Sequence, residues 1–169
     1  MCLSNSAINT FMSYKGLFKP RNPNKYRGDP TNIIYRSSYE LRLMSYLDAH
    51  QDVLEWSSEE IAIPYRSPID NRIHRYFPDF FVRRKTVDNL IESVIIEVKP
   101  YIQVKEPKPI IKGSKPTRRY LREVQTWGVN SAKWVAAEQY CKQREWKFQI
   151  LTEKDLGINN GKRIRQNTK

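Results

Sequence analysis

Two apolar, strand-like segments of this sequence carry acidic residues, and the second also carries a lysine. Asp79 lies in RYFPDFFV, and Glu97 and Lys99 lie in VIIEVKP. Residues two apart in a strand point to the same face, so Glu97 and Lys99 face one way. The alternating apolar residues Val94, Ile96 and Val98 then face the other way, toward the expected core. Charged side chains rarely lie among such neighbours unless they are paired, liganded or functional.

If the two strands are neighbours, Asp79, Glu97 and Lys99 converge on one point. Two carboxylates and an ammonium group are suited to bind a divalent cation and a phosphodiester. A simpler interpretation makes Glu97 and Lys99 an exposed charge pair and Asp79 a turn residue after a proline. The two flanking phenylalanines of Asp79 favour a strand over a turn. The conjunction of all three residues favours a catalytic site.

The charge balance points to a polyanionic partner. The chain has 169 residues, 39% of them hydrophobic, and a formal net charge of +12. This composition indicates one domain with extensions, and nucleic acid is a more probable partner than an anionic membrane surface. No apolar run is long enough to span a bilayer. The two cysteines, Cys2 and Cys141, show no metal-ligand spacing, which favours a reducing, intracellular compartment.

The hydrophobic pattern predicts a mixed α+β fold. A helix is expected from Ser37 to His50, with the serine as its cap and Glu40 in its first turn. Three strands follow in an antiparallel meander, then a short helix, a stronger helix and a final strand. The expected ranges are 53–65 (with a possible interruption at Ser57 and Ser58), 73–82, 91–99, 117–127, 131–144 and 146–151.

This element order, with Pro78-Asp79 on the second strand and Glu97-Val98-Lys99 on the third, resembles the PD-(D/E)xK nuclease superfamily. Glu40 matches the additional helix acid of many members. The chain is similar to the endonucleases of TnsA-type transposition systems, and more so to the head completion nucleases of tailed phages. The motifs that carry the resemblance lie at residues 14–26, 35–40, 56–59, 74–79, 96–100, 136–141 and 148–153.

Two departures from the TnsA-type pattern favour the phage proteins. TnsA-type proteins often carry glutamine where this chain has Glu97, and they have a C-terminal partner-binding domain for which this chain has no room. The resemblance implies a restriction-endonuclease-like fold, α/β in the broad sense, with a mixed central sheet flanked by helices. The expected domain division is a basic arm (1–34), a nuclease domain (35–156) that contains a basic flap (100–118), and a basic tail (157–169).

The resemblance and the chemistry together imply a role for each site residue. Asp79 and Glu97 would hold Mg²⁺, for which Mn²⁺ is a possible substitute, with the carbonyl of Val98 as a third ligand. Lys99 would orient the attacking water or stabilise the developing charge. Glu40 would hold a second metal or a metal-bound water, or it would serve only as a first-turn dipole acid. Gln125, on the first of the two later helices, is a weaker candidate for contact with the site.

DNA contacts are expected along the flap and at one strand residue. His74 is expected to contact DNA or lie on the strand surface rather than bind metal. Phosphate contacts carry no sequence information, so little sequence preference and a steep salt dependence are expected. The expected phosphate-binding residues are Lys105, Lys108, Lys112, Lys115, Arg118 and Arg119.

Three hypotheses for function follow. The first is a metal-dependent DNA nuclease of phage head completion that processes packaged double-stranded DNA, in the host cytoplasm or associated with the virion. Its further partners would be head, portal or neck proteins, without a membrane or a small-molecule cofactor. The second is a non-enzymatic virion protein that binds DNA ends. The third is a TnsA-like transposition or repair endonuclease.

Overall fold

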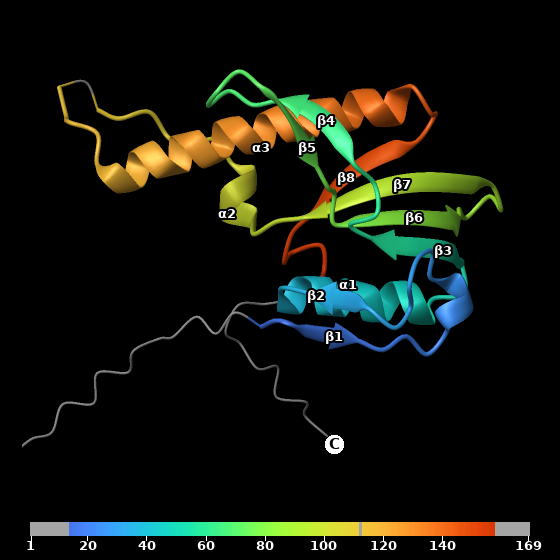
Figure 1. Cartoon of the computed structure of the whole chain (residues 1–169). Coiled ribbons are helices and arrows are strands. Elements are labelled where there is room, and N and C mark those ends of the chain that lie inside the picture. The colour runs from blue at the N-terminus through green and yellow to red at the C-terminus, as the bar shows by residue number, and fades with distance from the viewer. Residues whose placement is uncertain (1–13, 112, 158–169) are drawn as a thin grey trace, which may run out of the picture.

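A mixed four-stranded sheet forms the centre of the protein in the computed structural model, which describes residues 14–111 and 113–157 (Figure 1). The strand order is β3-β6-β7-β8. The first three strands are antiparallel neighbours, whereas β8 runs parallel to β7. The expected α+β class, with a mixed central sheet flanked by helices, is therefore confirmed. The bounds are β3 Val53–Ser58, β6 Phe80–Lys85, β7 Ile91–Val98 and β8 Lys147–Leu151.

One face of this sheet is covered by α1 (Ser38–Ala49) and by a small hairpin of β1 (Gly16–Phe18) and β2 (Ile33–Tyr35). A 3-10 turn, η1 (Pro23–Lys25), joins β1 to β2. The sequence predicts an extended basic arm over residues 1–34, and this prediction is wrong for residues 14–34, which belong to the fold. The prolines prevent a helix but not a hairpin. The segment folds because its few apolar side chains, Phe18, Tyr26 and Ile33, join the main core.

The opposite face is covered by α3 (Arg118–Lys142) and by a second hairpin of β4 (Ile63–Arg66) and β5 (Ile73–Tyr76). This hairpin corrects two predictions, because the expected strands 53–65 and 73–82 are each divided between two sheets. The chain leaves the central sheet after Ser58, where Glu59 adopts a positive φ of 56°. It re-enters after Pro78, which has no N–H for a strand ladder.

The α3 helix is continuous over 25 residues, whereas the sequence predicts two helices. Gly128 and Asn130 weaken the helical pattern. The helix nevertheless continues through them, because Val129 packs half-buried against the second core cluster and Asn130 is buried. Its N-terminal part extends beyond the sheet edge (Figure 1). Neither α3 nor any other helix within the described ranges is both long and apolar enough to cross a membrane.

Two smaller differences concern the segments that follow β7 and β8. The expected flap after β7 begins with a short helix, α2 (Tyr101–Val104), before it becomes irregular. The segment after β8, Thr152–Asp155, is a hydrogen-bonded turn rather than a regular helix, and in it Oδ2 of Asp155 accepts from both the amide and the hydroxyl of Thr152 at 2.8 Å. Residues 1–13 and 158–169, which include Cys2 and most of the expected tail, lie outside the described part of the chain.

Candidate active site

Asp79 lies at the point where the chain enters β6, directly beside the end of β7. The β6–β7 hairpin pairs Phe80 with Ile96, which leaves Asp79 opposite Glu97. The Asp79 carboxylate accepts a 2.7 Å hydrogen bond from the backbone amide of Val98. The two acids that the sequence places 18 residues apart are therefore brought together by an ordinary antiparallel register.

Glu97 is almost completely buried, with only 3% of its surface exposed. Its Oε1 forms a 2.8 Å ion pair with Nζ of Lys99, and its Oε2 accepts a 2.6 Å hydrogen bond from the phenol of Tyr76. The expected alternation is confirmed, because Val94, Ile96 and Val98 face the main core and Glu97 faces the other side. That second side is not open to solvent, since the β4–β5 hairpin covers it.

Tyr76 is a site residue that sequence reasoning missed. Its position in an apolar run suggests only a core tyrosine. The partial signal in the sequence is Pro78, which marks a break between Tyr76 and Asp79. The ring also lies 5.5 Å from Nζ of Lys133 on α3, measured to the ring centroid. Tyr76 therefore connects the β4–β5 hairpin and α3 to the Glu97 carboxylate.

The charges of the site are strongly coupled. Burial, followed by the negative charge of Glu97, raises the pKa of Asp79 to about 7, against the opposing effects of Lys99 and the Val98 amide. Burial lowers the pKa of Lys99, but the Glu97 and Asp79 carboxylates outweigh that effect, and the pKa is raised overall. Burial and the adjacent Glu97 carboxylate also raise the pKa of Tyr76. The site thus holds a charged Lys99 beside Asp79, whose carboxyl group resists ionisation.

Glu40 acts first as part of a helix cap. The Ser37 hydroxyl accepts from the Glu40 amide at 3.1 Å, while the Glu40 carboxylate accepts from the Ser37 hydroxyl at 2.9 Å and from the Arg36 amide at 2.8 Å. This reciprocal arrangement is a variant of the capping box, in which the Glu40 carboxylate accepts from the amide of Arg36, one residue before the Ser37 cap. The Glu40 charge still acts on the site, because it contributes to the raised pKa of both Asp79 and Lys99.

A short contact between Arg36 and Glu59 borders the same region. Their side chains form an ion pair, and the Glu59 carboxylate is the main cause of the raised pKa of Arg36. The Glu40 and Asp79 carboxylates also contribute to this raised pKa. The backbone amide of Glu59 donates to the carbonyl of Asp79 at 3.2 Å. An arginine therefore borders the acidic site on the side of α1.

The oxygen ligands available here suit a hard divalent cation. Among the residues that the structure describes, no group of three or more His, Cys, Asp or Glu side chains is close enough to hold a metal ion. The candidate ligands are therefore the carboxylates of Asp79 and Glu97 together with backbone oxygen and water. Mg²⁺ typically binds through one or two carboxylates and keeps several waters, so this set fits it. The role of the Val98 carbonyl stays a prediction.

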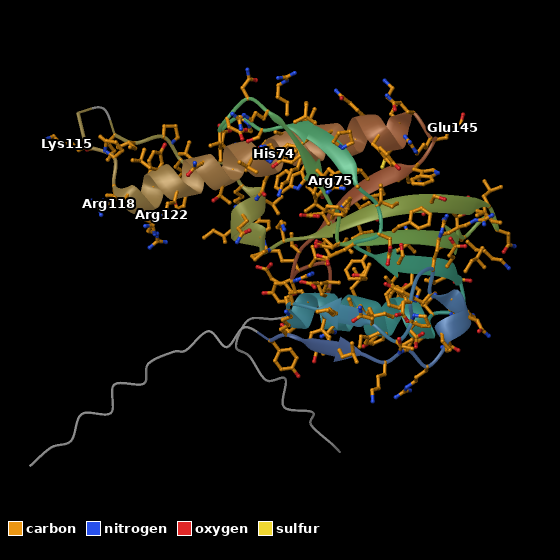
Figure 2. The ribbon with its side chains drawn as sticks, in the orientation of Figure 1. His74, Arg75, Lys115, Arg118, Arg122 and Glu145 are labelled. Carbon is orange, nitrogen blue, oxygen red and sulfur yellow. The ribbon has the colours of Figure 1, made fainter. Side chains whose placement is uncertain are left out.

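The expected DNA-contact residues are spread over two exposed regions. His74, on the β4–β5 hairpin, lies 2.8 Å from the Asp70 carboxylate. Arg118 lies at the projecting end of α3, with Lys115 in the loop just before the helix and Arg122 one turn further along it (Figure 2). Lys108 and Gln125 are exposed, Arg119 pairs with Glu123 at 2.9 Å, and Lys112 lies outside the described residues. Arg122 was not among the sequence predictions, although the four-residue spacing to Arg118 would have indicated it.

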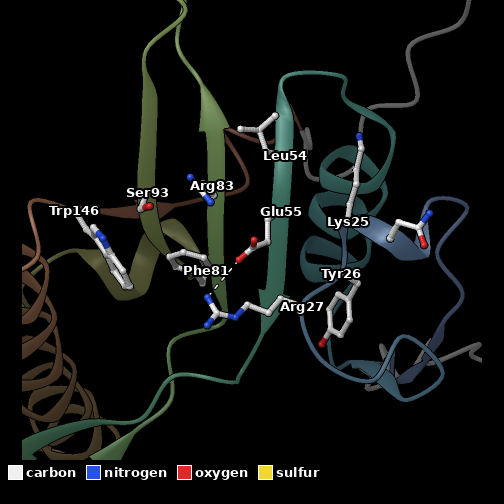
Figure 3. Close-up of a pocket in the computed structure, with 10 residues that line it drawn as sticks. Lys25, Tyr26, Arg27, Leu54, Glu55, Phe81, Arg83, Ser93 and Trp146 are labelled. Carbon is white, nitrogen blue, oxygen red and sulfur yellow. Dashed lines mark hydrogen bonds and ion pairs between the residues drawn. The ribbon is translucent and has the colours of Figure 1, made fainter.

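A cavity of about 730 Å³ lies elsewhere, between the segment around Arg27 and the uncovered part of the central sheet (Figure 3). Arg27 reaches across it to Glu55 at 3.3 Å. Arg83 and Trp146 also line it. The residues that line the cavity do not include Asp79, Glu97, Lys99 or Tyr76. The acid–lysine site is therefore separate from this hollow.

Two comparisons relate the chain to known proteins. Residues 50–153 match the family model described as TnsA-like endonuclease N terminal. The chain is also 37% identical, over 146 residues, to a protein of Enterobacteria phage T4 named Head completion nuclease. That match covers 86% of this chain and 95% of the phage protein. The family match spans Asp79, Glu97 and Lys99, whereas Glu40 lies before its first residue.

Proposed function

Because the chain belongs to the TnsA-like endonuclease family, we propose that it is a nuclease that hydrolyses DNA phosphodiester bonds at Asp79, Glu97 and Lys99. The observation that carries this proposal is that these side chains lie together at one end of the sheet, where the β6–β7 register places Asp79 opposite Glu97. Asp79 is fixed by the Val98 amide, and Glu97 is fixed by Lys99 and Tyr76. An exposed surface charge pair has no need of such burial.

Mg²⁺, or Mn²⁺ in its place, is the proposed cofactor, held by Asp79 and Glu97 with the Val98 carbonyl as a further oxygen ligand. A divalent cation would supply positive charge that favours the anionic oxygens of the phosphate and makes a water easier to deprotonate. Lys99 directs its ammonium group at the same place, where it can orient the attacking water or stabilise charge on the phosphate. Glu40 adds negative charge next to Asp79 and Lys99, and it is a candidate to hold a water molecule bound to the cation.

Double-stranded DNA is the proposed substrate. The net charge of +12 favours a polyanion, and exposed basic side chains line the flap and the projecting end of α3. Contacts of this kind bind phosphates and not base edges. We therefore expect cleavage with little sequence preference and binding that weakens steeply as salt is raised.

The biological setting is proposed from the phage relative. Its name, Head completion nuclease, together with 37% identity over most of both chains, supports a role in head completion. In that role the protein would process packaged DNA before the tail is joined. Head, portal or neck proteins would be its partners, and it would act in the host cytoplasm or on the virion.

A cleavage assay with matched variants tests the activity. Supercoiled plasmid and linear duplex are incubated with Mg²⁺, with and without a chelator. We expect wild-type protein to cleave only with free metal, and Asp79→Asn and Lys99→Ala to lose activity. Asp88→Asn and Lys85→Ala are the controls, because they remove the same charges at the far end of the β6–β7 hairpin.

The outcomes separate the hypotheses. Equal loss of DNA with wild type and both site variants would reveal a contaminating nuclease. Tight DNA binding without cleavage by any preparation would favour the non-enzymatic, DNA-end-binding alternative. Cleavage that survives the chelator would overturn the metal-dependent proposal while leaving the nuclease assignment intact.

A further inference from the structure

A cluster of two lysines and one tyrosine lies just beyond Lys99. The ammonium nitrogen of Lys154 is 3.3 Å from the ring centroid of Tyr101, and that of Lys105 is 4.5 Å from it. Tyr101 begins α2, and Lys105 follows that helix directly. Lys154 comes from the turn after β8, about fifty residues later in the chain.

The parallel pairing of β7 with β8 brings these segments together. Parallel strands end at the same edge of a sheet, so the residues that follow Val98 and Leu151 emerge side by side. The amide of Lys99 donates to the carbonyl of Leu151 at 2.9 Å. The amide of Tyr101 donates to the Glu153 carboxylate at 2.8 Å. Two hydrogen bonds donated by backbone amides, one to a carbonyl and one to a carboxylate, therefore fix the cluster next to the Glu97–Lys99 pair.

The chemistry of the cluster is that of an anion site. Two ammonium groups on separate segments converge on one tyrosine, although like charges repel each other. Both lysines are exposed, so their donors are accessible to a ligand. The two ammonium groups also act on the phenol, because they lower the pKa of Tyr101. An anion placed here would be attracted by both charges and would relieve their repulsion.

We propose that Tyr101, Lys105 and Lys154 bind a DNA phosphate that neighbours the phosphate held at Asp79, Glu97 and Lys99. This inference rests on the proposed nuclease function for the identity of the anion. Successive phosphates of one strand follow one another closely along the backbone, and the cluster begins two residues after Lys99. Its task is to fix the register of the strand, so that one particular bond lies at the catalytic residues.

The competing interpretation is that the lysines only pack on the ring. Exposed cation–π contacts of this kind are weakly stabilising and would join α2 to the turn after β8. Removal of Lys154 would then lower stability and leave DNA binding unchanged. A phosphate site predicts that removal of Lys154 weakens DNA binding and leaves stability unchanged, so the two interpretations differ in a measurable way.

The test measures binding of a short fluorescent duplex in the Asp79→Asn background, with Ca²⁺ in place of Mg²⁺ so that no cleavage occurs. Lys154→Gln and Lys105→Gln are compared with Lys85→Gln, an exposed lysine at the far end of β6. We expect each site variant to weaken binding about tenfold and to reduce the slope of log affinity against log salt by about one. The Lys85 variant should do neither. Thermal unfolding of each variant reports whether the fold is retained.

A second measurement locates the phosphate. Single phosphates of the duplex are replaced by neutral methylphosphonates, one position at a time. We expect a methylphosphonate at one particular position to weaken the binding of DNA by the protein that carries Lys154. The same replacement should not weaken binding by the Lys154→Gln variant. Site variants with the affinity and salt slope of the Lys85 control, or methylphosphonate effects unchanged by Lys154→Gln, would overturn the proposal. Failure of the proposed function is distinguishable, because it would appear as absent cleavage by wild type while these binding effects persist.

Discussion

The phenol of Tyr76 and the carboxylate of Glu97 meet between two different sheets, with a donor–acceptor distance of 2.6 Å in the interior of the protein. Tyr76 belongs to the β4–β5 hairpin, and Glu97 belongs to the central sheet. A buried carboxylate needs hydrogen-bond partners, and Glu97 has one on each oxygen. The hairpin therefore does more than cover a face of the sheet, since it also fixes one of the two acids of the candidate metal site.

Replacement of Tyr76 by phenylalanine should weaken metal-dependent cleavage. The ring keeps its packing while the donor to Oε2 of Glu97 is lost. Partners that orient a metal ligand typically contribute about 10–100-fold in metal affinity or activity. We expect the Mg²⁺ concentration for half-maximal cleavage to rise by about tenfold. Titration of initial rates with Mg²⁺ measures this effect.

Tyr65→Phe is the matched control for that variant, because Tyr65 is the other buried tyrosine of the same hairpin. Tyr76→Phe should unfold at a lower temperature than Tyr65→Phe, because it leaves Oε2 of the buried Glu97 carboxylate without its donor. Identical Mg²⁺ titrations for wild type, Tyr76→Phe and Tyr65→Phe would contradict a positioning role for Tyr76.

The stability of the metal-free protein should fall as pH rises toward neutrality. The pKa of Asp79 is raised to about 7 by burial and by Glu97, against about 4 in an unfolded chain. The folded protein then binds more protons than the unfolded one in this window, so the free energy of unfolding decreases as pH increases. Asp79→Asn removes this contribution, and we expect it to be more stable than wild type at pH 8 by on the order of 1 kcal/mol.

Denaturant unfolding in a chelator at pH 5 and pH 8 checks this expectation. The comparison is the difference between wild type and Asp79→Asn at each pH, because other groups also titrate. Bound Mg²⁺ requires the ionised carboxylate, so the same metal should stabilise wild type more at pH 8 than at pH 6. A difference between the two proteins that does not change with pH would show that Asp79 ionises normally.

The two roles of Glu40 can be separated by substitution. Ser37→Ala removes the cap of α1 and should lower the free energy of unfolding by about 1 kcal/mol. Glu40→Gln keeps a carbonyl acceptor for the cap but removes the negative charge next to Asp79 and Lys99. We expect it to lose cleavage activity while it retains most of its stability. Unfolding curves and cleavage rates of both variants provide the measurement.

Ser45→Ala, in the same helix, is the control for the cap, since its hydroxyl donates to the carbonyl of Leu41 within the helix. If Glu40→Gln cleaves DNA at the wild-type rate, Glu40 serves the cap alone and the site consists of Asp79, Glu97 and Lys99.

The projecting end of α3 should supply salt-dependent DNA affinity. Arg118 and Arg122 are one turn apart and exposed, so one phosphate strand can contact both. Their double replacement by alanine should reduce the slope of log affinity against log salt by about two. Arg119→Ala should have a smaller effect, because the Arg119 guanidinium is already paired with Glu123. Equal slopes for wild type and the double variant would place the DNA elsewhere on the surface.

The sequence by itself determined the parts of the site that depend on local pattern. The cap at Ser37 and the first-turn position of Glu40 follow from residue types at fixed offsets. The convergence of Asp79 with Glu97 follows from two apolar runs around a short polar loop, because the β6–β7 hairpin is symmetric about Asp88. Alternation within β7 then puts Glu97 and Lys99 on one side. None of these relationships requires contacts between distant segments.

Only the tertiary structure decided which neighbours complete the site. Tyr76 reaches Glu97 because the chain leaves the central sheet at Glu59, forms a separate hairpin and returns after Pro78. Lys154 reaches Tyr101 because α3 carries the chain back so that β8 lies parallel to β7. Residues 14–36 are part of the fold for a similar reason, since Phe18 and Ile33 bury themselves against Trp56 and α1. Local pattern cannot encode these contacts, because burial depends on surfaces that exist only after the distant segments have packed together.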